Sequence, residues 1–182
     1  MTTNAQNESI YIGESRQRRL AAPAFGELVT LYGEPCYKIG NLDALEPFFI
    51  SLVSSSDHWL FIASTGGLTA GRASAEQALF PYYTVDRITE NYENTGHKAI
   101  LRVQREGKLS LWEPFSERQQ GIYRVARSLY KNIAGTMLVF EETNRDLDLT
   151  YRYAWRTSEQ FGFIKPSWLV NGPSGACQVE LV

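Results

Sequence analysis

Residues 147–157 read LDLTYRYAWRT, a stretch in which large apolar and mainly polar side chains alternate. The large apolar residues occupy the odd positions from Leu147 to Trp155, and the positions between them are polar apart from Ala154. Successive side chains of a strand point to opposite faces of its sheet. The stretch therefore predicts a strand with one core face and one wet or polar-lined face.

Short runs of this kind recur from Pro23 onward, bounded by Gly, Pro, Asn, Asp and Ser, which is typical of an antiparallel sheet protein. HKAILRVQREGKLSLWEPF predicts a hairpin with Gly107 in its turn, and only DALEPFF and SAEQALF suit a turn or two of helix. These runs give eleven candidate strands, which is more than one open sheet usually contains. We predict an all-β fold, a large two-sheet antiparallel β-sandwich. The other runs are FGELVTLY, PCYKIG, FFISLVS, HWLFIAS, YRVARSLY, TMLVFEET, FGFIKPSWLVN and ACQVELV.

The chain of 182 residues fits one domain. Residues 1–20 lack periodicity and predict a flexible or partner-dependent lead, and residues 21–182 predict the β-sandwich domain. The last run, ACQVELV, still has strand character at Val182. We therefore expect a domain truncated at its C-terminal end, with a native edge strand as the alternative.

Composition and charge limit the kinds of partner and the location that we expect for the chain. The net charge is −2, and the one basic run, ESRQRRL, has no interleaved aromatic platform, so we expect no nucleic-acid partner. The sequence contains no run of about 18 apolar residues, so we predict no membrane span. The polar first residues lack the apolar core of a secretory peptide, which predicts a cytoplasmic location. Cys36 and Cys177 have no metal-site spacing and are expected to be buried free thiols.

Residues 64–83, STGGLTAGRASAEQALFPYY, contain two glycines with the spacing of a phosphate-binding loop. That loop needs a lysine for the phosphates and a hydroxyl for magnesium, and this chain has Arg72 and Ala73 there. We therefore expect no nucleotide cofactor. The glycines predict a tight link between two strands, because they can adopt positive φ.

No set of residues commits the chain to catalysis. Ser56, Asp57 and His58 could form a triad on paper, but neighbours on an extended segment face opposite ways. The same argument separates Glu141 from Glu142, while Glu113 and Glu142 would need the fold to bring them together. We assign no catalytic residue and no metal ligand.

Aromatic side chains accompany arginines and carboxylates on neighbouring runs. Sugars stack on flat rings while charged side chains bind their hydroxyls, so this mixture suits a carbohydrate-facing surface. Aromatic residues that fill a sandwich core, with arginines pairing carboxylates at its rim, would give the same pattern. The candidate substrate-binding residues are Arg72, Tyr82, Tyr83, Arg87, Trp112 and Glu113.

The C-terminal third, with WLVN at 168–171, GPSGA at 172–176 and VEL at 179–181, resembles the N-terminal super-sandwich domain of cellobiose-phosphorylase-type enzymes and related glycoside hydrolases. The topology of that domain is similar to that of galactose mutarotase. Residues 49–88, FISLVSSSDHWLFIASTGGLTAGRASAEQALFPYYTVDRI, also resemble the opening of large bacterial proteins described as glycosidases, in which a sandwich precedes a helical barrel.

This resemblance implies a non-catalytic domain, because the catalytic acid of these enzymes belongs to the following barrel. The sandwich packs on that catalytic domain, contributes to homodimers and lends a loop to the sugar site. Two alternatives remain: a self-sufficient carbohydrate-binding module, and a sugar epimerase-like enzyme. An epimerase would need a histidine and a carboxylate within hydrogen-bond reach of one point in a cleft.

Overall fold

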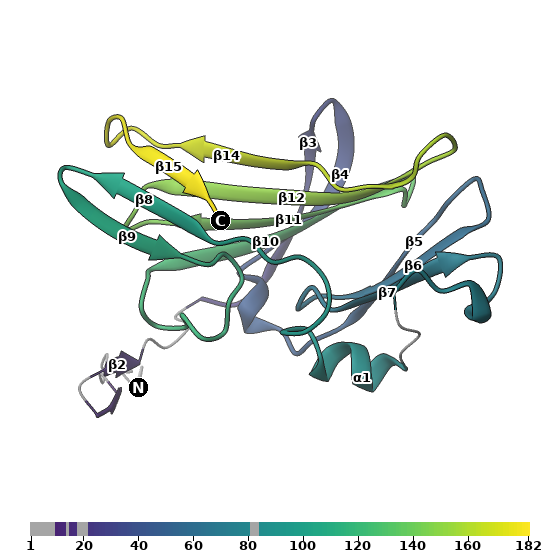
Figure 1. Ribbon diagram of the computed structural model, residues 1–182, viewed down its shortest axis with the longest axis horizontal. Coiled ribbons are helices and arrows are strands. Elements are labelled where there is room, and N and C mark those ends of the chain that lie inside the picture. The colour runs from purple at the N-terminus through teal and green to yellow at the C-terminus, as the bar shows by residue number, and fades with distance from the viewer. Residues whose placement is uncertain (1–9, 14, 18–21, 81–83) are drawn as a thin grey trace, which may run out of the picture.

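All the alternating runs form strands, and these strands pair antiparallel (Figure 1). The structure is a computed structural model, and it describes residues 10–13, 15–17, 22–80 and 84–182. The largest sheet has seven strands in the order β13-β12-β11-β10-β4-β3, with β14 also paired to β12. These strands are β3 (Phe25–Leu31), β4 (Glu34–Gly40), β10 (Val125–Asn132), β11 (Met137–Asn144), β12 (Leu149–Ser158), β13 (Gly162–Ile164) and β14 (Ser167–Asn171).

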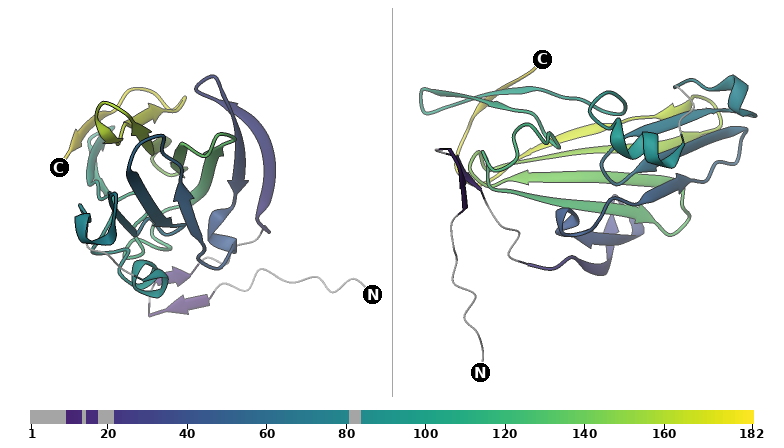
Figure 2. Two further views of the ribbon diagram at one scale, coloured as in Figure 1. Left: turned by 90° about the vertical axis from the view of Figure 1, so that its right-hand side faces the viewer. Right: turned by 90° about the horizontal axis from the view of Figure 1, so that it is seen from below.

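Two three-stranded sheets form the opposing layer (Figure 2). One consists of β5 (Phe49–Leu52), β6 (His58–Ala63) and β7 (Leu68–Arg72), and the other of β15 (Gln178–Leu181), β8 (Leu101–Arg105) and β9 (Lys108–Trp112). Buried side chains from all three sheets join in one hydrophobic core. The all-β sandwich is thus confirmed, with one of its layers divided in two.

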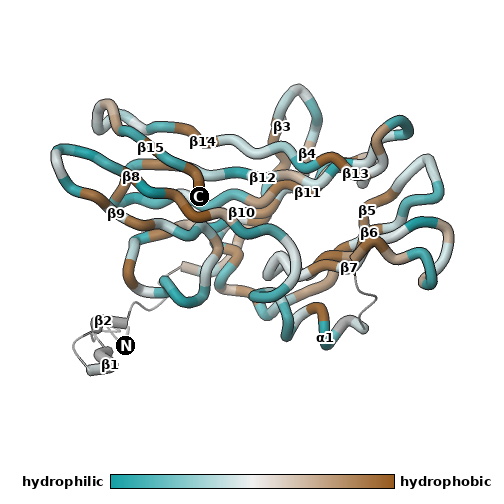
Figure 3. Tube along the Cα trace, viewed as in Figure 1, coloured by the Kyte–Doolittle hydropathy of each residue, from teal (hydrophilic) through white to brown (hydrophobic). Residues whose placement is uncertain are grey.

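The core face of β12 follows the predicted alternation. Leu149, Tyr151, Tyr153 and Trp155 are all at most 7% exposed and belong to the main core. Figure 3 shows further hydrophobic residues gathered on β5, β6 and β7, which face this core. The run FGFIKPSWLVN, expected as one strand, forms β13 and β14, because Pro166 lies between them and cannot donate to a sheet ladder.

The opposite face of the large sheet is only partly polar, contrary to the prediction. A second, smaller core lies there, because the β3–β4 hairpin folds over it. Its tip carries Tyr32, whose ring stacks on Trp168 at 4.6 Å. Ala154 is therefore fully buried, although it lies between two residues of the main core face. The buried members are Cys36, Tyr130, Met137, Val139 and Ala154.

Two turns confirm their sequence predictions. β8 and β9 form the expected hairpin, and both central residues have positive φ, 50° at Glu106 and 78° at Gly107. The glycine-rich segment links β6 to β7, with Gly66 at φ 95°. A Cβ at Gly67 would lie 2.3 Å from the Ile88 carbonyl oxygen, so only glycine fits there without a shift.

The described chain also contains three short helical elements: η1 (Leu42–Ala44), η2 (Ala75–Gln77) and α1 (Val85–Glu90). The first two lie in the segments expected to form helical turns, and α1 was not expected. Its sequence, VDRITE, is rich in β-branched residues, which have modest helix propensity. Burial of Ile88, which is 0% exposed, explains why the helix forms.

The remaining elements are β1 (Ile10–Ile12) and β2 (Ser15–Gln17), which pair within the expected lead. Both cysteines are free thiols, with Cys36 fully buried and Cys177 only partly buried. Among the described residues no helix is long and apolar enough to cross a membrane.

Candidate ligand cavity around Arg127

The candidate site begins with an ion pair on the inner face of the large sheet. Arg127 on β10 and Glu142 on β11 are register partners, so their side chains project to the same face. The Arg127 Nε donates to Glu142 Oε2 at 2.7 Å. Glu142 is 2% exposed and Arg127 is 9% exposed, so the pair lies out of water.

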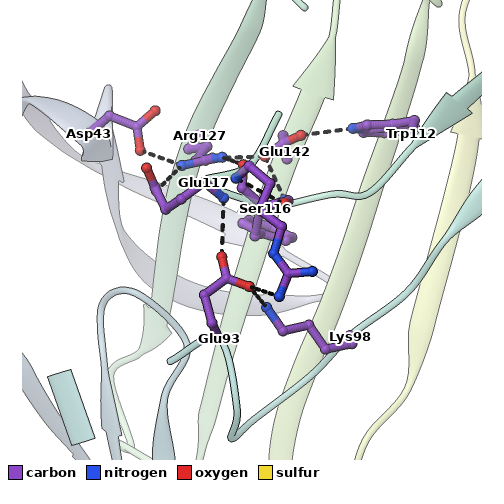
Figure 4. Close-up of polar contacts among 10 residues, drawn as sticks. Asp43, Glu93, Lys98, Trp112, Ser116, Glu117, Arg127 and Glu142 are labelled. Atoms are coloured by element: carbon purple, nitrogen blue, oxygen red, sulfur yellow. Dashed lines mark hydrogen bonds and ion pairs between the residues drawn. The ribbon is translucent and has the colours of Figure 1, made fainter. Parts of the chain in front are cut away.

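Glu142 accepts two further hydrogen bonds (Figure 4). The Trp112 indole N–H donates to Oε1 at 2.8 Å, and the Phe115 backbone N–H donates to Oε2 at 2.8 Å. Phe115 has φ 64°, a left-handed conformation that costs a bulky residue about 1–3 kcal/mol. Glu142 therefore stabilises the strained start of the loop that follows β9.

Arg127 also binds the loops around it. Its Nη1 donates to Asp43 Oδ1 at 3.2 Å and to Glu117 Oε1 at 3.1 Å, and its Nη2 donates to the Ser116 carbonyl oxygen at 3.4 Å. Burial alone would lower the pKa of Arg127, but Glu142, Asp43 and Glu117 raise it above its usual value. The guanidinium stays charged and holds three carboxylates together.

Two adjoining cavities meet at this cluster, because Asp43, Gln120 and Arg127 line both. The larger has a volume of about 300 Å³ and the smaller about 40 Å³. The walls of the larger cavity come from the η1 region, the β6–β7 turn, the end of α1 and the loop after β9. Its other lining residues are Leu42, Leu45, Pro47, Ser64, Thr65, Thr89, Tyr92, Phe115 and Glu117.

The polar groups of the wall differ in how they are paired. Burial, followed by the charges of Glu117 and Glu93, raises the pKa of Tyr92, so its hydroxyl keeps its proton at neutral pH. Thr65 Oγ1 is shielded from solvent and has no hydrogen-bond partner among the described residues. Glu93 is bound to Lys98 at 2.8 Å, and this hydrogen bond is the main reason why the pKa of Glu93 is lowered.

The structure brings two of the predicted substrate-binding residues to this site. Glu113 lines the smaller cavity and is half-buried. Trp112 also lines it, but the residue is 1% exposed and belongs to the main core. The prediction of Trp112 as a ring available to a sugar is therefore wrong, since its indole packs in the core and binds Glu142.

The other predicted residues lie elsewhere. Arg72 ends β7 and lines a separate cavity that also includes Asp57. Arg87 is an exposed residue of α1 and lines none of the three cavities described. Tyr82 and Tyr83 fall outside the described residues.

The two histidines and the acidic residues of the described chain do not form the catalytic arrangements considered in the sequence. His58 Nδ1 lies 2.7 Å from Ser56 Oγ, but no hydrogen bond joins Asp57 to His58 among the described residues. Neither His58 nor His97 lines any of the three cavities, which does not favour an epimerase. In the described part of the chain, no group of three or more His, Cys, Asp or Glu residues is placed to hold a metal ion.

Sequence reasoning missed Asp43, Glu117 and Arg127. Arg127 was detectable in part, because it lies in phase with Leu129 and thus at an inward position of β10. A charged residue at an inward position of a strand requires a partner. Its partner Asp43 lies in the short element η1 and its partner Glu117 in the loop after β9, where strand periodicity gives no information.

No protein-family model matches this chain, and a search of curated proteins gives no match either.

Proposed function

We propose that this chain is a non-catalytic β-sandwich domain of a carbohydrate-active protein of glycoside hydrolase or phosphorylase type, and that its Arg127 cavity contributes a sugar-binding site. In this proposal the domain packs on a catalytic domain of its parent protein and takes part in a homodimer. The resemblance to super-sandwich domains supports the class of parent protein. The cavity over the Arg127 cluster supports the sugar site, and it is the observation on which the proposal depends.

The cavity offers the groups that a sugar requires. Asp43 and Glu117 accept hydrogen bonds, and the Tyr92 hydroxyl can donate one. The rings of Tyr92 and Phe115 provide apolar surface for the faces of a sugar ring. A volume of about 300 Å³ is at the lower end of ligand sites in proteins, which suits one or two sugar rings.

The contacts of Glu142 support a non-catalytic role. Oε1 accepts from Trp112, and Oε2 accepts from Phe115 and Arg127. A catalytic carboxylate needs an oxygen that can reach the scissile bond. Because both Glu142 oxygens bind protein donors, the most buried carboxylate of the cavity serves to hold the loop.

Calorimetric titration of the chain with a panel of oligosaccharides tests the proposal. We expect heat with one class of saccharide and none with the others. Tyr92→Ala should weaken that binding at least about tenfold, because it removes both a ring face and a hydroxyl from the cavity wall. Tyr37→Ala is a matched control, since Tyr37 is 57% exposed on β4 and lines none of the described cavities.

Two results would contradict the sugar site. One is the absence of heat with every saccharide in the panel. The other is equal weakening by Tyr92→Ala and Tyr37→Ala, which would place binding outside the cavity.

A further inference from the structure

The charges that line the two cavities are strongly unequal. Four carboxylates line them against a single guanidinium, that of Arg127. Two cations outside the lining, Lys98 and Arg118, are both bound to Glu93, at 2.8 and 3.5 Å. The site therefore presents net negative charge to any molecule that enters it. The four carboxylates are Asp43, Glu113, Glu117 and Glu142.

Arg127 cannot serve as an anion clamp. A guanidinium recognises a carboxylate or phosphate through two parallel N–H groups. Here Nε binds Glu142, Nη1 binds Asp43 and Glu117, and Nη2 binds the Ser116 carbonyl oxygen. No parallel pair of donors remains for a ligand, so uronic acids and sugar phosphates are repelled by the carboxylates and find no bidentate contact with Arg127.

Asp43 and Glu117 are placed differently from the buried Glu142. Each uses one carboxylate oxygen on the same Arg127 nitrogen, so the two carboxylates are held close together. Their second oxygens make no hydrogen bond among the described residues. The side chains are 27% and 38% exposed, so a ligand can reach them. Two adjacent, negatively charged hydrogen-bond acceptors suit a positively charged group with several N–H donors.

The aromatic wall of the cavity suits a positively charged ligand as well. The Tyr92 ring lines the cavity, and a cation is attracted to the face of a tyrosine ring.

We propose that the ligand of this cavity is an amino sugar, a saccharide with a free protonated amine that binds between Asp43 and Glu117. This inference rests on the proposed sugar-binding function and specifies its ligand class. The ammonium group donates to the two free carboxylate oxygens. Acylation of the amine removes the positive charge and two of the three donors, so an N-acetylated saccharide loses this recognition.

Titration with four tetrasaccharides of equal length tests the inference: a glucosamine oligomer, its N-acetylated counterpart, a neutral glucose oligomer and a galacturonate oligomer. At pH 6 and low salt we expect the glucosamine oligomer to bind at least about tenfold more tightly than the N-acetylated one, and the galacturonate oligomer to give no heat. Raising the salt to 1 M should reduce the preference, because the two carboxylates are partly exposed.

Two isosteric variants locate the amine. Asp43→Asn and Glu117→Gln should each remove most of the ratio between the affinities for the glucosamine and glucose oligomers, because each removes one of the two negative charges that bind the amine. Glu180→Gln is a control, because Glu180 pairs with the exposed Arg102 and lines none of the described cavities. The salt series on the unchanged chain tests the same point if a variant fails to fold.

The outcomes separate the two proposals. Equal affinity for the glucosamine and glucose oligomers, or a preference for galacturonate, would overturn the amino sugar and leave the sugar site intact. A preference for the amine that survives both isosteric substitutions and 1 M salt would also overturn it. The absence of heat with all four oligomers would overturn the amino sugar, and its absence with every saccharide of the panel would overturn the sugar site as well.

Discussion

Two neighbouring glutamates of β11 make ion pairs on opposite faces of the same sheet. Glu142 points inward to Arg127 on β10, and Glu141 points outward to Arg152 on β12, with N–O distances of 2.7 and 2.5 Å. Their side chains are 2% and 12% exposed. The geometry of the two bonds is similar, so the difference between the pairs lies in their surroundings.

The inner pair is part of a larger network than the outer pair. Glu142 accepts from Trp112 and Phe115, and Arg127 also donates to Asp43 and Glu117. Besides Arg152, Glu141 binds the Tyr130 hydroxyl at 2.8 Å. The Arg152 side chain is 27% exposed, against 10% for Arg127. Water can therefore compensate the loss of the outer pair far better than the loss of the inner pair.

Arg127→Met should give the largest effect. It leaves the Glu142 carboxylate buried without its counter-ion and releases Asp43 and Glu117 from the cavity floor. We expect the free energy of unfolding to fall by about 3–5 kcal/mol, measured by urea denaturation. A double variant with Glu142→Leu should recover part of the loss, since it removes the unpaired charge. A loss below about 1 kcal/mol in Arg127→Met would contradict the assignment of the inner pair as the stronger one.

The opposite orientation of Glu141 and Glu142 follows from the sequence alone, because side chains in a strand alternate. The sequence of β11 does not indicate which face is inward, because Met137 and Val139 are in phase with Glu141 just as Leu138 and Phe140 are in phase with Glu142. The positions of the partners of Arg127 do not follow from the sequence either. Asp43 lies 84 residues away in η1, and Glu117 lies 10 residues away in the loop after β9. Their positions depend on how the loops pack, which no periodic pattern encodes.

The outer face shows a similar limit. The pattern of β12 predicts a polar face from Thr150, Arg152 and Arg156, yet Ala154 on that face is fully buried. The cause is the β3–β4 hairpin, which the sequence predicts as two strands without placing it over the sheet. Contacts such as Arg156 to Glu34, 122 residues apart, arise only from that placement.

A pH series distinguishes the two faces further, because a half-buried histidine packs against the inner face. His97 Nε2 lies 2.6 Å from the hydroxyl of Tyr151, the register partner of Glu142. Burial, followed by the charges of Lys165 and Lys98, lowers the pKa of His97 from 6.5 to about 4. The folded chain thus favours neutral His97. Its contribution to stability is complete above pH 6.5 and is lost as the pH falls from 6.5 to 4.

The full pKa shift corresponds to about 3 kcal/mol, and because His97 is only half-buried, solvent screening should reduce the loss to about 2 kcal/mol, measured by urea denaturation at several pH values. The carboxylates also begin to titrate near pH 4, so the quantity to compare is the difference between the original chain and His97→Gln. That difference should depend on pH between 6.5 and 4 and be constant above 7. A difference independent of pH would show that His97 is exposed enough to protonate without cost.

The smallest effect should come from Arg152→Met, which is the outer counterpart of Arg127→Met. The Tyr130 hydroxyl remains as a donor to Glu141, and water can reach the space that Arg152 leaves, so the carboxylate is not stranded. We expect a loss of about 1 kcal/mol in the same urea experiment. If Arg152→Met and Arg127→Met cost the same, burial would not explain the difference between the faces. The β3–β4 hairpin would then have to be regarded as a second cooperative part of the fold, in which Arg152 holds Tyr32 and Trp168 in place.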